Sequence, residues 1–417
     1  MLAWFIVLLL VQAAGLAMVS GVLTSIRTQY RSKWFHPIAW VAVFYGGWFG
    51  IPQVYFLASD GFLVGLEQYD QQTRLQFAVQ SQIALIVFLS ITMMVALLVQ
   101  SLGTTTQDRT VELEMDRALS TSDQLYALIC LIVGTGAVIY LGQQNLSSDM
   151  MRSELVKTTS GKVLTSLMYF GAYGFAFMLG ESLRRKRYFV AAAVLVFFGA
   201  PVMMTGARGR FLLPLMSAVV YLSTDRRRLF TPTNVSAAIL CIAVIAFADR
   251  LLNSVKFDQD ADLGRGAAEV FERRNFDGFS NFTLIQNTYE GESKPSVLVR
   301  GSRDTFMNYY FAEEYSRGVG FGSTVPGTAW IAGRWWGLAI VAVGYGIVLG
   351  LLDQWLRRMR DPQSYWCYLI SITWFASLAG NYVESIDKLA IVMMPALLAI
   401  PLRMLSQRFI QERPELR

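Results

Sequence analysis

The sequence predicts an all-α polytopic membrane protein of about eleven transmembrane helices, with one large loop outside the cytoplasm. Hydrophobic residues make up 54% of the chain and charged residues 16%, and the mean hydropathy is +0.41. Soluble domains carry about 25% charged residues. Uncharged runs recur along the whole chain, and most have the roughly 20 residues needed to cross a hydrocarbon core. Lys and Arg gather in alternate loops, as they do in multi-pass proteins.

The predicted spans follow the uncharged runs. These runs are residues 1–26, 34–59, 75–107, 124–148, 163–180, 188–207, 211–224, 229–248, 335–352, 363–383 and 389–402. The first run lacks a basic n-region and exceeds a typical signal-peptide core, so it predicts a retained helix. The runs 211–224 and 389–402 are short, and their helices must tilt or borrow flanking residues. The three cysteines lie inside runs without CxxC spacing, which predicts packing rather than metal or redox roles.

The distribution of Lys and Arg predicts the orientation of the chain. Basic residues concentrate in residues 27–33, 109–117, 184–187, 226–228, 357–360 and 403–417. By the positive-inside rule these segments are cytoplasmic, so the N-terminus lies outside the cytoplasm and the C-terminus inside it. The net charge of +6 is explained by this topology rather than by nucleic-acid binding. The predicted organisation is transmembrane helices 1–8 in residues 1–249, a large non-cytoplasmic loop at 250–327, helices 9–11 in 328–404, and a cytoplasmic tail at 405–417.

The loop at 250–327 is much longer than the others and rich in aromatic residues. Nine Lys/Arg and eleven Asp/Glu lie between Arg250 and Pro326. This aromatic content is too high for a disordered linker, and long loops that fold are usually functional. Ala267–Arg274 and Arg303–Tyr315 have helical character, so the loop is expected to be partly helical and to fold over a site.

Arginines and carboxylates on the non-cytoplasmic side are the candidate site residues. Arg208 and Arg210 lie between two hydrophobic runs, where such charges cost about 2.5–3.5 kcal/mol each at a bilayer centre. The arginine fork suits phosphate oxygens, and a carboxylate can take a proton from an attacking hydroxyl. The loop adds Arg273, Arg274 and Arg303 as phosphate ligands, and Asp277, Asp304, Glu313 and Glu314 as candidate bases. The alternatives are snorkelling side chains at a helix end and ordinary surface ion pairs.

Spacing along a helix would bring two of the loop motifs together. Arg303-Asp304 and Glu313-Glu314 are nine to ten residues apart, close to the same face of a continuous helix. The tryptophans Trp330, Trp335 and Trp336 fit an aromatic belt at the membrane interface, although Trp330 and the loop tyrosines can also stack on sugar rings.

No motif predicts a metal or a cofactor. Asp258–Asp262 alternates carboxylates but lacks the glycine and the closing glutamate of a calcium loop. Gly318–Gly322 lacks the βαβ context of a dinucleotide fingerprint. His36 is the only histidine and lies in a predicted cytoplasmic loop, so no histidine base is expected on the outer face.

Two sequence patches resemble the O-antigen polymerase (Wzy) or oligosaccharide repeat-unit polymerase family. Residues 205–213, TGARGRFLL, resemble the arginine-glycine turn of the family at a periplasmic helix boundary. Residues 320–330, GFGSTVPGTAW, and 334–339, RWWGLA, are similar to the glycine-serine turn and helix that close its large periplasmic loop. The likeness covers most of the chain in topology and these two patches in sequence.

This resemblance implies a type C glycosyltransferase-like enzyme in the bacterial inner membrane. It would transfer a growing glycan from undecaprenyl diphosphate to another lipid-linked repeat unit, building an O-antigen-like surface polysaccharide of the lipopolysaccharide type. The periplasmic arginines of the family correspond to Arg208 and Arg210, with Arg274 and Arg303 as further counterparts. Implied partners are undecaprenyl-diphosphate-linked glycans, the lipid bilayer and a chain-length regulator.

Three other functions remain open from the sequence, and one of them is a structural or interaction protein. Related O-antigen ligases use a histidine in the large loop, and its absence here counts against a ligase. A lipid-linked oligosaccharide flippase or transporter is the main non-enzyme alternative, and such proteins usually contain interrupted helices. Charges gathered at one face favour surface chemistry instead.

Overall fold

The computed structural model describes part of the chain. The described residues are 1–25, 41, 45–59, 61, 63, 65–102, 121–147, 159–204, 211, 214–215, 217–218, 278–313, 323–358, 394–395, 397–399 and 401–402. Every regular element in them is helical, as the predicted all-α class requires. Four of the described helices are long and apolar enough to cross a membrane, namely Gln71–Leu102, Ser122–Gln144, Ser160–Arg184 and Val325–Gln354. The total of eleven spans stays a prediction.

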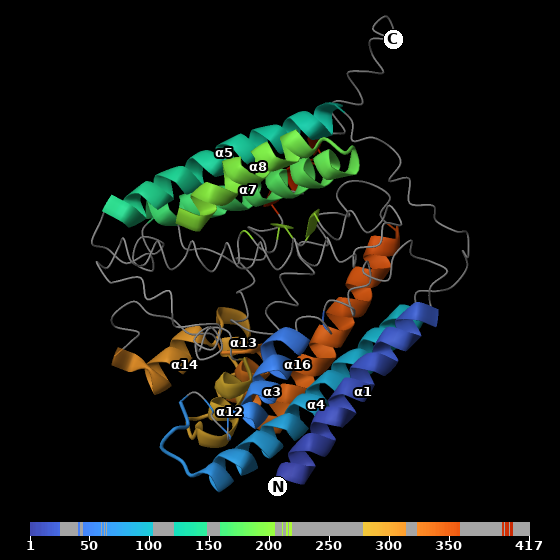
Figure 1. Ribbon diagram of the computed structural model, residues 1–417, viewed down its shortest axis with the longest axis vertical. Helices are drawn as coiled ribbons and strands as arrows, with labels where there is room; N and C mark the ends of the chain where they lie inside the picture. The colour runs from blue at the N-terminus through green and yellow to red at the C-terminus, as the bar shows by residue number, and fades with distance from the viewer. Residues whose placement is uncertain are drawn as a thin grey trace, which may run out of the picture. The chain divides into compact units, whose positions relative to one another are not determined.

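The helices form two compact units, labelled in Figure 1. Unit 1 contains α1 (Leu2–Ser25), the π-helix η2 (Gly46–Gly50), α3 (Ile51–Ala58), α4 (Gln71–Leu102), α12 (Gly278–Thr288), α13 (Val297–Arg300), α14 (Arg303–Tyr310) and α16 (Val325–Arg358). Unit 2 contains α5 (Thr121–Ser147), α7 (Thr159–Arg184) and α8 (Tyr188–Met204). Unit 1 therefore combines the first hundred residues with the segment that follows residue 264.

Unit 2 is held together by backbone contact between α5 and α7. A Cβ added at Gly134 would lie 2.1 Å from Gly171 N, and one at Gly174 would lie 2.3 Å from Ala127 O. These pairs show that the two helices run in opposite directions. Small residues commonly allow membrane helices to approach this closely, because lipid provides no hydrophobic force between them.

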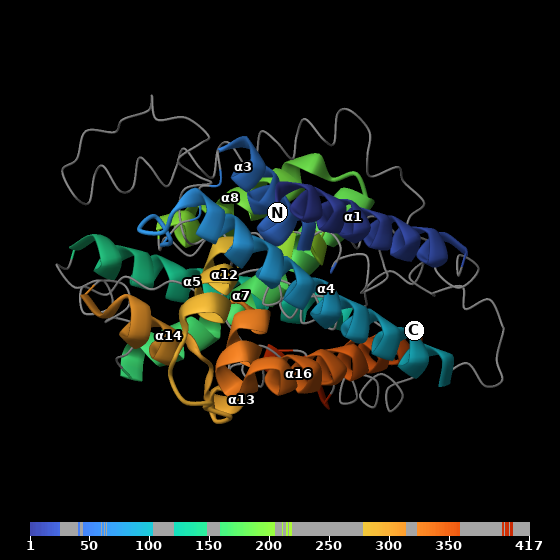
Figure 2. The same ribbon diagram turned by 90° about the horizontal axis from the view of Figure 1, so that it is seen from below.

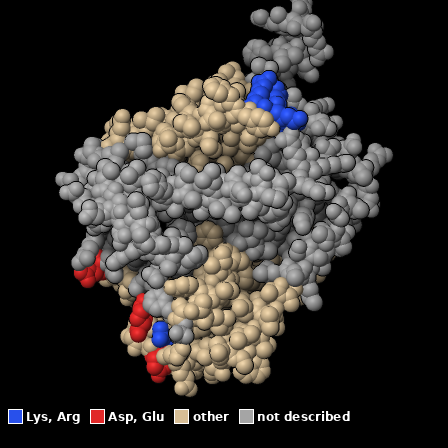
Figure 3. Space-filling view, in the orientation of Figure 1, with Lys and Arg blue, Asp and Glu red and all other residues tan. Residues whose placement is uncertain are grey.

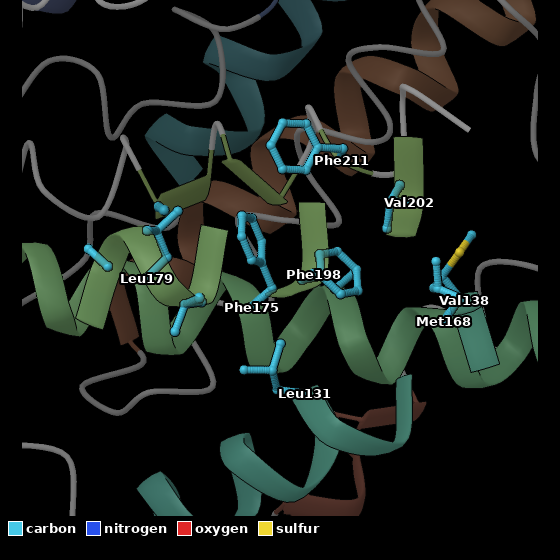
Figure 4. Packing of buried hydrophobic residues seen from close by; sticks show 12 residues of the cluster. Leu131, Val138, Met168, Phe175, Leu179, Phe198, Val202 and Phe211 are labelled. Carbon is cyan, nitrogen blue, oxygen red and sulfur yellow. The ribbon is translucent and has the colours of Figure 1, made fainter. Parts of the chain in front are cut away.

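Aromatic packing completes the core of unit 2 (Figure 4). The Phe175 ring lies 5.0 Å from the Phe198 ring and 5.7 Å from the Phe211 ring, between centroids. The turn after α7 carries basic residues, which gather at one end of the unit in Figure 3. There Glu181 accepts hydrogen bonds from Arg184 at 3.0 Å and from Arg185 at 2.5 Å. This turn is a predicted cytoplasmic loop.

The two long helices of unit 1, α4 and α16, lie side by side and run in the same direction (Figure 1, Figure 2). A Cβ at Gly346 would lie 2.6 Å from Thr92 O, and one at Gly350 would lie 2.5 Å from Val99 Cβ. Gln354 donates a hydrogen bond to Val99 O one turn further along. The predicted topology assigns the same direction to both helices.

The helix α12 is buried inside unit 1 although it belongs to the predicted periplasmic loop. Its side chains Phe279, Phe282 and Ile285 are fully buried. The Phe279 ring lies 6.2 Å from the ring of Phe5 in α1, and a Cβ at Gly327 would lie 2.7 Å from Ile285 Cδ1. A helix of eleven residues spans about 16 Å and is too short to cross a bilayer. At α12, therefore, the predicted loop is packed among the helices of unit 1 and does not lie on their outer ends.

Polar contacts align α12 with α4. The Asn287 amide donates to Ser81 Oγ at 3.1 Å, and Ser81 in turn hydrogen-bonds to the Gln286 side chain. Ser81 is fully buried. Hydrogen bonds to a buried hydroxyl help to fix the register of a short helix against its neighbour.

Candidate functional site

The helix α16 is broken near its start, at Gly333 and Arg334. Arg334 has φ 54° and ψ −131°, a conformation that residues other than glycine rarely adopt. A Cβ at Gly337 would lie 2.0 Å from Ala329 O, eight residues earlier. In a straight helix residues eight apart are about 12 Å apart along the axis. The break therefore folds the short first part of α16 sharply against the beginning of the long part.

The break also opens the helix to the segment that follows α12. In an unbroken helix Ile331 O would accept the amide of Trp335. Here the amide of Lys294 donates to Ile331 O at 3.0 Å. The 289–296 segment is thus attached to the backbone of α16 at the break, which satisfies a carbonyl that the break frees.

Arg334 places its guanidinium between two aromatic rings and this segment. Its Cζ lies 5.2 Å from the ring centroid of Tyr289 and 5.9 Å from that of Trp330. Its Nη2 donates to Gly291 O at 3.3 Å. Among the described residues no carboxylate pairs with this guanidinium. Its other N–H groups therefore remain available in the described part of the site, which suits a bound anion.

An aromatic cluster adjoins Arg334 through Tyr289 and Trp330, and it also contains Tyr309, Tyr310 and Trp335. Ring centroids are 4.8 Å apart for Tyr289 and Tyr309, 4.7 Å for Tyr309 and Tyr310, and 5.4 Å for Trp330 and Trp335. Tyr289 and Trp330 are 3% and 7% exposed, whereas Tyr309 and Trp335 are 45% and 49% exposed. Each exposed ring is thus held by a buried ring that contacts the same arginine.

The tyrosine hydroxyls hold α14 against the end of α12. Tyr309 Oη accepts a hydrogen bond from Glu290 N at 3.2 Å, and Tyr310 Oη lies 3.1 Å from Thr288 Oγ1. Burial raises the pKa of Tyr310 above its usual value of 10.0. Its hydroxyl is therefore neutral at physiological pH and acts as a hydrogen-bonding group rather than as a base.

Three buried hydroxyls attach the start of α16 to the segment before α14. Ser302, Ser323 and Thr328 are fully buried. Ser302 Oγ lies 2.5 Å from Thr328 Oγ1 and also hydrogen-bonds to Ser323 Oγ. Thr324 Oγ1 accepts from Gly327 N at 3.0 Å, as an N-cap does. The glycine-serine patch of the sequence thus positions the broken helix.

The structure describes few of the site residues that the sequence predicted. Arg208, Arg210, Arg273, Arg274, Asp277 and Glu314 lie outside the described residues. Arg303 opens α14, but its side chain is also outside the described set. Asp304 and Glu313 are described and exposed, and no described contact brings them to Arg334. Their predicted roles as bases stay predictions.

One expectation about this segment is wrong. The sequence predicted a continuous helix over Arg303–Tyr315, with Asp304 and Glu313 close to one face. In the structure α14 ends at Tyr310, and Phe311 has φ −140°. The Phe311 side chain is buried against Phe306, with ring centroids 5.4 Å apart. This packing accompanies the end of the helix, so the shared face does not form.

Sequence reasoning missed Arg334. The uncharged run that predicts this span begins at Trp335, and Arg334 enters the sequence analysis only as the first residue of the 334–339 patch, not as a candidate site residue. The available signal was a single charge between Arg317 and Asp353 in an otherwise uncharged stretch. Ionisable residues in such positions are functional candidates by default.

Comparisons with protein-family models, curated proteins and solved structures find no match to this chain. Among the described residues no group of three His, Cys, Asp or Glu side chains is placed to hold a metal ion. The expectation of a metal-free site stays a prediction.

Proposed function

We propose that this chain is a membrane glycosyltransferase that polymerises oligosaccharide repeat units linked to undecaprenyl diphosphate, at the periplasmic face of the bacterial inner membrane. The observation that carries the proposal is Arg334, held at a helix break between Tyr289 and Trp330. Arginine matches the oxygens of a diphosphate, and aromatic residues commonly line sites for ligands with apolar faces.

The chemical demand of this reaction fits such an arginine. The leaving group is a lipid diphosphate, and its negative charge develops as the glycosidic bond to phosphate breaks. A fixed, partly buried cation stabilises that charge better than a solvated one, because it needs no reorganisation. Arg208, Arg210, Arg273, Arg274 and Arg303 are the further diphosphate ligands in this proposal, with Asp304, Glu313 or Glu314 as the base.

The arrangement of unit 1 supports a location for the site at one membrane face. The beginning of α1 lies beside α12, through the contact of Phe5 with Phe279. The 289–296 segment, where Gly291 O accepts a hydrogen bond from Arg334, follows α12 directly. The predicted topology puts the N-terminus in the periplasm, and the same end of unit 1 then faces the periplasm.

Arg334 gives the direct test of this function. Purified protein is supplied with lipid-linked repeat units, and the product chain length is read on a gel. We expect Arg334→Ala to abolish polymerisation. Arg334→Lys should reduce it about 10- to 100-fold, because the charge stays while the fork of donors is lost. Lys294→Ala is the matched control, since it removes an exposed charge from the adjoining segment. Long chains made by Arg334→Ala would contradict the proposal.

A flippase or transporter is the second candidate, favoured by the same broken helix. Discontinuous helices form the binding sites of many transporters, and α16 is discontinuous at Gly333–Arg334. Deleting the gene separates the two functions. Loss of a polymerase leaves single repeat units on the cell surface, whereas loss of a flippase leaves lipid-linked units at the cytoplasmic face.

A further inference from the structure

We propose that Tyr309 and Trp335 form a sugar-binding platform near Arg334, which takes the pyranose ring next to the lipid diphosphate. This inference rests on the proposed function and extends it from the phosphate to the glycan. It assigns the two rings to substrate recognition rather than to the membrane interface.

The geometry of the two rings carries the inference. Tyr309 is 45% exposed and contacts buried Tyr289, and Trp335 is 49% exposed and contacts buried Trp330. Both buried rings lie within 6 Å of the Arg334 Cζ. Two half-exposed aromatic rings are therefore each one ring away from the same cation.

A glycosyl diphosphate has the chemistry that matches this arrangement. Its sugar ring presents an apolar C–H face beside a strongly anionic group. An aromatic ring can cover the C–H face while the guanidinium binds the phosphate oxygens. In the 289–296 segment, Gly291 O accepts a hydrogen bond from Arg334, and Glu292 O accepts one from the Tyr289 hydroxyl.

Contacts of Tyr309 distinguish this ring from a residue of a lipid-facing aromatic belt. A belt residue presents its ring to lipid and its polar tip to water. The Tyr309 hydroxyl instead accepts a protein hydrogen bond from Glu290 N, and the ring also packs on Tyr310. Trp336 is 78% exposed and serves as the comparison, because it neighbours Trp335 but does not belong to the cluster.

Binding measurements with two probes test the platform. The probes are the native lipid-linked oligosaccharide extracted from source membranes, and undecaprenyl diphosphate without glycan. Full-length protein in lipid nanodiscs is titrated with each. We expect Tyr309→Ala and Trp335→Ala each to weaken binding of the glycan probe about three- to tenfold, the range for one aromatic contact. Both should bind the glycan-free probe as the wild type does. Tyr309→Phe should retain the affinity for the glycan probe.

The controls separate failure of the platform from failure of the function. Arg334→Ala should weaken both probes, and Trp336→Ala should change neither. If Tyr309→Ala and Trp335→Ala bind the glycan probe normally while Arg334→Ala does not, the platform is wrong and the proposed function survives. If wild-type protein binds neither probe, both proposals fail. Equal weakening of both probes by the ring variants would indicate a structural role and would also overturn the platform.

Discussion

The backbone of Arg334 is held in a conformation that costs free energy. A non-glycine residue with φ near +54° and ψ near −131° carries about 1–3 kcal/mol of strain. The guanidinium contacts to Tyr289, Trp330 and Gly291 O offset that cost in the folded state. Strain retained at a cationic residue is the kind of local conflict that functional sites contain.

Glycine at this position should separate stability from function. Glycine adopts positive φ without strain, whereas alanine does not. We expect the free energy of unfolding of Arg334→Gly to exceed that of Arg334→Ala by about 1 kcal/mol. Arg334→Gly should therefore unfold at the higher temperature. Both variants should be equally inactive, since both lack the guanidinium. Thermal unfolding in detergent and the polymerisation gel measure the two properties. An active Arg334→Gly variant would mean that the break matters and the charge does not.

The buried hydroxyl of Tyr310 predicts a loss of stability in alkali. Burial raises its pKa above 10.0 in the folded state. The unfolded chain then loses this proton first as pH rises, so stability is present below pH 10 and falls above it. Tyr310→Phe removes the titrating group and should flatten this part of the curve. Unfolding temperatures measured from pH 8 to pH 11 give the comparison, and identical slopes would contradict the assignment.

At the scale of the helix, close glycine contacts decide which pairs of helices can pack. Gly134 meets the backbone of Gly171, whereas a Cβ at Gly136 would meet nothing within 4 Å. The two glycines are in the same helix, two residues apart. Gly134→Ala must push α5 away from α7, whereas Gly136→Ala occupies open space.

These two alanine variants form a matched pair. We expect Gly134→Ala to lower the free energy of unfolding by about 1–3 kcal/mol, the usual cost of overpacking. Gly136→Ala should be neutral or slightly stabilising, because alanine is the better helix former. Thermal unfolding of the purified proteins measures both. Equal stability of the two variants would show that α5 and α7 do not make this contact in the membrane.

Much of the helical framework could be predicted from hydrophobic runs. The uncharged runs at 75–107, 124–148 and 163–180 correspond to α4, α5 and α7 within a few residues at most ends. The buried α12 could not be found in this way, because eleven residues of mixed polarity give no span signal. Its burial depends on contacts with α1 and α4, which are distant in sequence.

The site was harder to predict than the helical framework, because it too depends on contacts that hydrophobic runs do not reveal. The break in α16 depends on the fit of Gly337 against Ala329 and on the aromatic rings around Arg334. Local propensity does not encode a turn of this kind, so the sequence predicts a loop as far as residue 327 and an uncharged run only from Trp335, whereas α16 begins at Val325. Tertiary packing likewise ends α14 at Tyr310, where the charge spacing suggested a longer helix.

At the scale of the whole molecule, the packing inside each unit restricts the possible topologies. In unit 1, α4 and α16 run in the same direction. If both helices span the membrane, the chain must therefore cross it an even number of times between the start of α4 and the start of α16. In unit 2, α5 and α7 run in opposite directions. The topology predicted by the positive-inside rule agrees with both directions. One span more or one span fewer in residues 103–324 would make α4 and α16 run in opposite directions.

Cysteine labelling of intact cells tests the absolute orientation. In a chain whose three native cysteines are replaced, Ser293→Cys puts a thiol on the exposed segment beside Arg334, and Arg187→Cys puts one on the exposed turn after α7. Once the outer membrane is made permeable, we expect a membrane-impermeant maleimide to label Ser293→Cys, because the predicted topology puts this segment in the periplasm. Arg187→Cys should react only after lysis, since its turn keeps three other basic residues that hold it in the cytoplasm. The reverse pattern would put Arg334 on the cytoplasmic side, where glycans carried on the outer leaflet cannot reach it, and the polymerase proposal would then fail.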